Sequence, residues 1–134
     1  RRVAQGLDAN RLAMLLAILS RHAGGSRQEH DVFANVVGGL TLAETATDLP
    51  LVLALASSLR DRPLPQVLVA FGEVGLTGEV RPVAYGEERL REAAKQGFKV
   101  AVVPQGNVPR KPIEGLAVRG VSRVTEAIAA AEAV

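Results

Sequence analysis

The stretch Val36–Ser58, VVGGLTLAETATDLPLVLALASS, decides how the rest of the chain can be arranged. It predicts the end of a strand, a loop that opens with two glycines, and a very apolar helix beginning near Thr47 or Asp48. Either residue can act as the N-cap, because a short side-chain oxygen can accept free amides of the first turn. Pro50 falls in that turn, where its missing N–H costs little. A helix that is apolar on all sides is buried, so the loop Gly38–Thr47 should lie at the N-terminus of a core helix, where anions are favoured.

The length and composition limit the class of protein. A chain of 134 residues predicts one domain, 1–134. It contains no cysteine, which excludes disulfides, thiolate chemistry and cysteine-bound zinc. No run approaches the roughly 20 apolar residues that span a bilayer, and we expect a cytoplasmic protein with no membrane partner. The sequence opens with Arg1-Arg2-Val3 and has no initiating Met, so we expect it to be part of a longer protein.

Helices and strands are predicted on both sides of the central stretch. Their expected ranges are a helix from Ala9 to about His22 capped by Asp8, a strand Asp31–Val37, the central helix to about Arg60, a strand Val67–Phe71 covered on both faces, a hairpin Gly72–Pro82, a helix from Gly86 to Gln96, strands Lys99–Val103 and Ala117–Gly120, and a last helix capped by Ser122 with Val124, Ile128 and Ala131 inside. A strand, a helix and a strand in succession favour a parallel crossover in one sheet. The predicted fold class is α/β, in an α+β two-layer arrangement with helices packed on a mixed sheet.

Several familiar binding motifs are missing. The phosphate-loop pattern GxxxxGK[ST] is absent, so the chain should not hydrolyse a nucleotide by itself. Glycines at 72, 75 and 78 are better explained by a hairpin than by a dinucleotide site. His22 and His30 have no metal-site spacing and are expected on the surface. Glu87 and Glu88 are expected on a solvated helix face, where they favour the helix N-terminus.

Three stretches carry a resemblance to a known family: SSLRDRPLP (57–65), FGEVGLTGEVRPV (71–83) and NVPRKPIEG (107–115). The chain resembles the proteolytic domain of Lon proteases over essentially its whole length. It is still more similar to the C-terminal Lon-like domain of the RadA (Sms) family of bacterial DNA repair and recombination proteins. The resemblance implies a Lon proteolytic-domain-like fold.

The Lon resemblance also implies a catalytic serine in the central loop and a lysine at the start of the helix after the hairpin. Counting along the motifs places the serine at Ala46 and the lysine at Glu87. A methyl group is not a nucleophile, and a glutamate cannot serve as the amine base of such a pair. We therefore expect no catalytic residue in this domain, with Ala46 and Glu87 as vestigial positions.

An active Lon-type peptidase remains the alternative interpretation of the same positions. Thr45 and Thr47 flank Ala46 and could supply a hydroxyl, and Arg89 is the nearest cation at the second position. A guanidinium stays protonated at neutral pH and cannot act as a base. The peptidase interpretation is therefore much the weaker one.

The RadA resemblance implies a role in DNA transactions. Such proteins are hexameric ATPases that act on branched DNA and drive branch migration. It implies that ATP with magnesium and a zinc motif belong to other parts of the longer protein, a DNA-dependent ATPase or helicase, and that this domain holds no cofactor and no metal. The implied partners are other copies of the chain, DNA and, through the longer protein, a recombinase.

Arginines are the residues expected to contact DNA. Only three of the sixteen cations are lysines, and arginine suits bidentate contact with phosphate. The candidate contacts lie in loops and turns: Arg110, Lys111, Arg119, Arg123, Arg81, Arg60 and Arg62. Two alternatives stay open, a scattered solvated surface and a pure oligomerisation scaffold whose arginines are used in subunit contacts.

Overall fold

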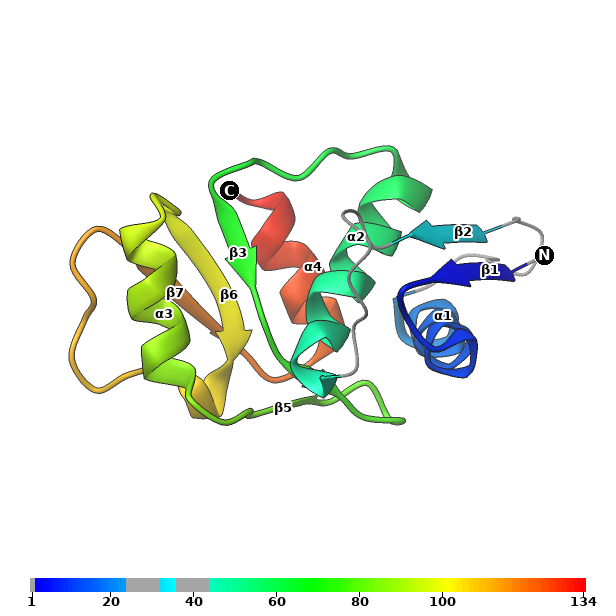
Figure 1. Cartoon of the computed structure of the whole chain (residues 1–134), viewed down its shortest axis with the longest axis horizontal. Helices are drawn as coiled ribbons and strands as arrows, with labels where there is room; N and C mark the ends of the chain where they lie inside the picture. The colour runs from blue at the N-terminus through cyan, green and yellow to red at the C-terminus, as the bar shows by residue number, and fades with distance from the viewer. Residues whose placement is uncertain (1, 24–31, 36–43) are drawn as a thin grey trace.

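A computed structural model describes residues 2–23, 32–35 and 44–134 of the chain (Figure 1). In these parts the elements, in order, are β1 (Arg2–Gln5), α1 (Ala9–Ala23), β2 (Val32–Asn35), the 3-10 turn η1 (Thr45–Thr47), α2 (Asp48–Arg60), β3 (Leu68–Ala70), β4 (Glu73–Val74), β5 (Val80–Arg81), α3 (Gly86–Lys95), β6 (Val100–Pro104), the 3-10 turn η2 (Gln105–Asn107), β7 (Ala117–Val121) and α4 (Val124–Glu132). Helices packed on parallel and antiparallel strands confirm the predicted α/β class and are consistent with an α+β two-layer arrangement.

The strands form three small sheets. β1 and β2 are parallel, β3, β6 and β7 form a parallel sheet in the order β3-β6-β7, and β4 and β5 form an antiparallel hairpin. The predicted hairpin over Gly72–Pro82 is therefore confirmed. The predicted crossover is wrong, because β2 pairs with β1 and β3 pairs with β6, so the strands before and after α2 belong to different sheets.

Two hydrophobic clusters lie on opposite sides of the three-stranded sheet. Ala101 and Val103 of β6 belong to the cluster that contains Leu90 of α3, whereas Val102 belongs to the cluster of α1, α2 and α4. This division follows from the strand geometry, since successive side chains point to opposite faces. In Figure 1, α3 lies in front of β6 at the left, and α4 and α2 stand between this sheet and the β1–β2 pair.

Helix α2 is the core helix that the central stretch predicts. Its buried side chains are Asp48, Leu49, Val52, Leu53, Leu55 and Ala56. The predicted N-cap position is confirmed at Thr47, but the predicted mechanism is wrong, because neither Thr47 nor Asp48 caps the helix with its side chain. The Thr47 hydroxyl donates to the Glu44 carbonyl at 2.6 Å, and the Asp48 carboxylate accepts the Val74 N–H at 3.1 Å.

Three further expectations need correction. The strand β1 is not foreseen by the sequence, because four half-polar residues show no clear period until the Val32–Asn35 partner is known. The strand β3 is half-buried, since it has only β6 beside it among the described strands. Ser122 does not cap α4. The Glu126 carboxylate instead reaches back to the N–H groups of Ser122 and Arg123, both at 2.9 Å, as in a capping box.

Other predicted boundaries agree with the structure. Asp8 caps α1, because its carboxylate accepts the Asn10 N–H at 2.9 Å. Gly97, at φ 93°, follows the end of α3 as a left-handed C-terminal residue. The predicted stop of α1 at Gly24-Gly25, the loop 24–30 with His30, the glycines 38 and 39, and Arg1 lie outside the described residues. Among the helices in the described ranges, none has the length and apolar character to cross a bilayer.

Candidate nucleic-acid interface and the groove beside Ala46

A groove opens beside the N-terminus of α2. Residues from η1, β4, the β5–α3 connection and α3 line it, including Glu44, Thr45, Ala46, Glu73, Tyr85 and Arg89. Ala46 forms a wall of the groove, because its side chain is only 3% exposed and its carbonyl accepts the Gly72 N–H at 2.8 Å. The methyl group of Ala46 therefore lies at the position where the Lon resemblance implies a serine hydroxyl.

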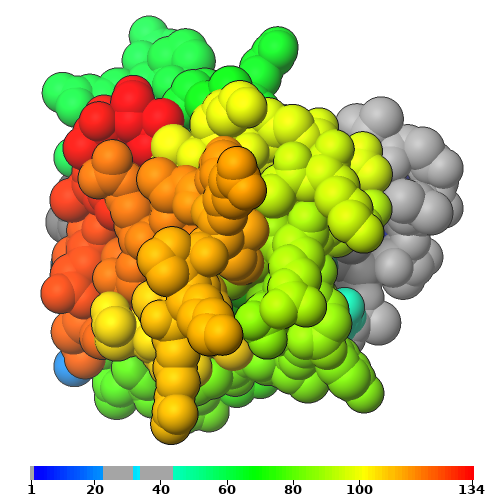
Figure 2. Space-filling view, turned by 90° about the vertical axis from the view of Figure 1, so that its left-hand side faces the viewer, coloured from blue at the N-terminus to red at the C-terminus, as the bar shows by residue number. Residues whose placement is uncertain are grey.

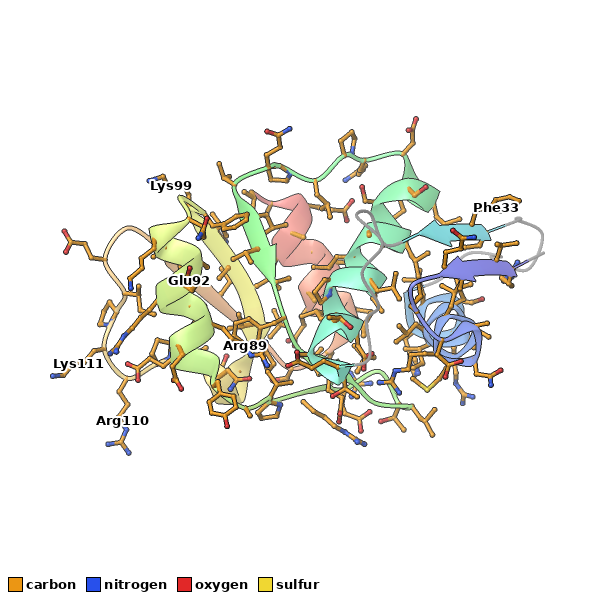
Figure 3. The ribbon with its side chains drawn as sticks, in the orientation of Figure 1. Phe33, Arg89, Glu92, Lys99, Arg110 and Lys111 are labelled. Atoms are coloured by element: carbon orange, nitrogen blue, oxygen red, sulfur yellow. The ribbon has the colours of Figure 1, made fainter. Side chains whose placement is uncertain are left out.

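Arg89 crosses this groove from α3. Its guanidinium forms an ion pair with Glu44, and its Nε donates to the Ala84 carbonyl at 2.9 Å. The same guanidinium lies 5.8 Å from the centroid of the Phe71 ring, within the range of a cation–π contact. Figure 3 shows Arg89 between α3 and the start of α2. Three contacts therefore fix the side chain, and it links the two sides of the groove.

Glu87, the position where the Lon resemblance implies the lysine, does not lie in the groove beside Ala46. It is exposed at the first turn of α3, outside the residues that line the groove, and its carboxylate pairs with Arg91 at 3.0 Å. Thr45 lines the groove, and Thr47 donates its hydroxyl to a backbone carbonyl. Among the described residues, the groove thus has a hydroxyl but no histidine or lysine that could act as its base.

A buried carboxylate, Asp48, lines a neighbouring pocket that shares Glu44 and Thr45 with this groove. Asp48 is 3% exposed and accepts hydrogen bonds from Arg11 Nε at 2.8 Å and from the Val74 N–H. The Asp48 carboxylate raises the pKa of Arg11 through this hydrogen bond. Sequence reasoning misses this pair. The signal in the sequence that could have indicated the pair is Asp48, a single acidic residue at the start of an apolar run.

Three of the predicted DNA contacts are engaged with carboxylates. Arg60 and Arg62 both face Glu132 of α4, at 3.5 and 3.1 Å. Arg81 faces Glu73 at 3.5 Å and Glu79 at 2.8 Å. Glu79 also accepts from the Thr77 hydroxyl and N–H, and these bonds together with that of Arg81 lower the pKa of Glu79 to about 2.

Arg123 is also used within the fold. Its guanidinium donates to the Thr77 carbonyl, so this candidate fixes the hairpin against the start of α4. His22 lies nearby and was expected on the surface, but it is half-buried and packs beside Gly78. The described residues include no group of three histidine, aspartate or glutamate side chains that could hold a metal ion.

Arg110, Lys111 and Arg119 differ from these candidates. All three are exposed, and none forms an ion pair with any residue in the described part of the chain. Figure 3 shows Arg110 and Lys111 pointing away from the body at the edge of the molecule. Lys99, a further exposed cation without an ion pair in the same described ranges, lies at the start of β6 and was not among the predicted contacts.

The fold holds the loop of Arg110 against the strand of Arg119. A Cβ on Gly120 of β7 would overlap Gln105 Oε1 and lie 2.5 Å from Val108 Cγ2. Only glycine therefore lets the loop after η2 pack this closely on β7. In Figure 2, the gold and orange segment that contains this loop stands forward on its face beside the yellow-green α3. The structure thus brings the loop cations and the β7 cation onto adjoining segments.

Comparison with known proteins adds two findings. A family model described as "Subunit ChlI of Mg-chelatase" matches residues 21–107. The chain is 61% identical over 128 residues to a protein of Salmonella typhimurium named "DNA repair protein RadA", 59% identical over 128 residues to the Escherichia coli protein of that name, and 45% identical over 130 residues to that of Bacillus subtilis. Each match covers 96% of this chain, and the chain spans 28% of the length of each relative.

Proposed function

The chain belongs to the family described as subunit ChlI of Mg-chelatase, and because relatives named DNA repair protein RadA match nearly all of it, we propose that it is a non-catalytic domain of a DNA repair and recombination protein. In this role the domain, 1–134, is Lon-like, assembles with other copies of itself into a hexameric ring, and contacts DNA without reading its sequence. The DNA that it contacts is undergoing branch migration, in the cytoplasm.

The remaining activities belong to the rest of the longer protein in this proposal. ATP hydrolysis with magnesium, a zinc motif and contact with a recombinase lie outside the chain, so the domain itself uses no cofactor. DNA-dependent ATPase or helicase activity would then require the longer protein, with this domain contributing assembly and substrate contact.

The proposed DNA contact is supported by one observation: some of the predicted cations pair with carboxylates of the same fold and others do not. Arg60, Arg62 and Arg81 face carboxylates of their own fold. Arg110 and Lys111 are exposed on a projecting loop and have no such partner among the described residues. A cation that is not paired within the protein can approach a phosphate without breaking an internal ion pair, and such contacts position nucleic acid without specifying sequence.

A salt titration with duplex DNA tests the proposal. Anisotropy of a labelled duplex is measured for the wild type and for Arg110→Ala/Lys111→Ala at several salt concentrations. Removing one cation that touches a phosphate should reduce the slope of log K against log salt by about 0.9, so the slope of the double variant should fall by about 2. Arg91→Ala is the matched control, because Arg91 is also exposed but pairs with Glu87. Equal slopes for all three proteins would rule out the loop as a DNA contact.

The same variants separate DNA contact from a pure scaffold. Light scattering reports the oligomer, and anisotropy reports the DNA. Loss of DNA binding with the oligomer intact supports contact through Arg110 and Lys111. Loss of assembly in the double variant would instead favour a scaffold whose cations lie between subunits.

A peptidase assay tests the non-catalytic part of the proposal. Ala46→Ser places a hydroxyl in the groove, and the double variant Ala46→Ser/Glu87→Lys also places an amine at residue 87, outside the groove-lining residues. We expect neither the wild type nor Ala46→Ser to cleave casein, because the described groove residues offer no base beside Thr45 or residue 46. Cleavage by the wild type that is abolished in Thr45→Ala or Thr47→Ala would establish the peptidase alternative.

A further inference from the structure

The two cations of the projecting loop lie between two prolines. Arg110 and Lys111 are the central residues of the sequence Pro109-Arg110-Lys111-Pro112, and both are exposed. Each proline ring fixes its own φ at about −65°. Lys111 directly precedes a proline, which disfavours the helical conformation for it. The backbone that carries the two cations therefore has few conformations available to it.

The loop is also anchored at both ends. At its far end, Ile113 packs against the hydrophobic cluster that contains Leu90 and Leu116, and the Leu116 N–H donates to the Ile113 carbonyl at 3.2 Å. At its near end, the Val108 N–H donates to the Gln105 carbonyl at 3.2 Å and closes the η2 turn. The cations thus project from a segment whose two ends are held by the fold (Figure 3).

The turn η2 is fastened in its turn to the connection between β5 and α3. The Asn107 side chain binds both the N–H and the carbonyl of Val83, each at 2.9 Å. Close packing adds to these bonds, since a Cβ on Gly86 would lie 2.6 Å from Asn107 Nδ2 and a Cβ on Gly106 would lie 2.6 Å from Pro82 Cγ. Two hydrogen bonds to one residue resist both sliding and rotation of η2, so Asn107 fixes the direction in which the loop leaves the body.

We propose that Asn107 is a positioning residue for DNA contact, which holds Arg110 and Lys111 in place by fastening the start of their loop to the backbone of Val83. This inference rests on the DNA contact proposed above and names the residue that orients it. Asn107 acts without touching DNA. A loop that is ordered before binding loses less conformational freedom when it binds, and affinity is higher for that reason.

Loss of orientation and loss of charge differ in their dependence on salt. The slope of log K against log salt reports the number of phosphates that the protein neutralises. Asn107→Ala keeps every cation, so its slope should equal that of the wild type while its affinity for a duplex falls about tenfold at each salt concentration. Arg110→Ala/Lys111→Ala should instead reduce the slope by about 2.

A double-mutant cycle, read by the anisotropy of a labelled duplex, tests whether Asn107 acts through the two cations. Asn107→Ala is made in the wild type and in Arg110→Ala/Lys111→Ala. We expect the substitution to weaken binding about tenfold in the wild type and to have almost no effect where the cations are already missing. Gly86→Ala repeats the test without changing η2, because the added methyl group displaces the Asn107 amide. It should also lower the affinity and leave the slope unchanged.

Val52→Ala is the matched control for lost stability alone. Val52 is uncharged, fully buried in α2 and part of the cluster on the other face of the sheet, so this variant should be less stable but bind DNA as the wild type does. Thermal unfolding shows that each variant is folded at the temperature of the binding measurement. Wild-type binding by Arg110→Ala/Lys111→Ala would refute the proposed DNA contact itself. Weaker binding by that variant, together with wild-type affinity in Asn107→Ala or an equal effect of Asn107→Ala in both backgrounds, would refute only the positioning role.

Discussion

The side chain of Asn107 pairs with the backbone of Val83 as a strand neighbour would. Its Nδ2 donates to the Val83 carbonyl and its Oδ1 accepts the Val83 N–H, both at 2.9 Å. Asn107 also packs so closely on Gly86 that a Cβ there would lie 2.6 Å from Nδ2. One side chain thus ties η2 to the connection between β5 and α3, which forms one side of the groove.

Replacing Asn107 should destabilise the fold through these two bonds. Asn107→Ala leaves a half-buried N–H and carbonyl without their partners, at a cost of about 1–3 kcal/mol. Asn107→Asp keeps the acceptor but places a second carboxylate oxygen against the Val83 carbonyl, so it should also be less stable than the wild type. Urea unfolding measures both. Equal stability of all three proteins would contradict a role for the amide.

The buried Asp48 gives a second prediction. Removing Arg11 leaves the carboxylate with the Val74 N–H as its remaining described partner, which should cost about 2–3 kcal/mol because Arg11 is partly exposed. Arg11→Met keeps most of the packing volume and tests the charge alone. Thermal unfolding of Arg11→Ala, Arg11→Met and the double variant Arg11→Met/Asp48→Leu checks this. If the charge dominates, the double variant should be more stable than either single variant at Arg11.

The network at Glu79 predicts how stability depends on pH. Its pKa falls from 4.5 to about 2 in the fold, through hydrogen bonds from Thr77 and Arg81. A carboxyl group with a lowered folded pKa stabilises the fold above about 4.5, and this contribution disappears as the pH falls towards about 2. The difference in unfolding free energy between wild type and Glu79→Gln should therefore shrink over this range. A difference that stays constant from about pH 6 to about pH 2 would contradict this linkage.

The contact of Gly120 with the loop after η2 gives a prediction for DNA binding. Gly120→Ala introduces a methyl group against Gln105 and Val108, and should displace the loop that carries Arg110. DNA affinity should fall although no charge changes. Gly115→Ala is the control for backbone strain alone. A Cβ there meets no atom within 4 Å, but the φ of 81° disfavours alanine. If Gly120→Ala binds DNA with unaltered affinity, the position of the loop does not determine DNA contact.

The sequence allowed the elements with strong local signals to be predicted. Apolar spacing located α1 and α3, a nearly continuous apolar run located α2, glycine spacing located the hairpin, and the apolar run 99–103 located β6. Pairing between distant segments was not predictable in the same way. β1 can be recognised as a strand only from its pairing with β2. The capping of α4 depends on the orientation of the Glu126 carboxylate rather than on the type of residue at 122.

The candidate site was predictable only as a set of residues. Sequence identified Ala46, Glu87, Arg110 and Lys111, but it could not show which cations face a carboxylate of the same fold. Arg62 meets Glu132 across 70 positions of chain, a separation that no local pattern records. The role of Arg89 in the groove depends likewise on Glu44, which lies 45 positions away.

Alternate residues of β6 serve the two hydrophobic clusters, and this has a mechanical consequence. Ala101 and Val103 belong to one cluster and Val102 to the other, so pulling out this strand would open both at once. Loss of β6 should therefore weaken both clusters together. A load applied through β6 should therefore disturb the packing on both faces of the sheet in one step.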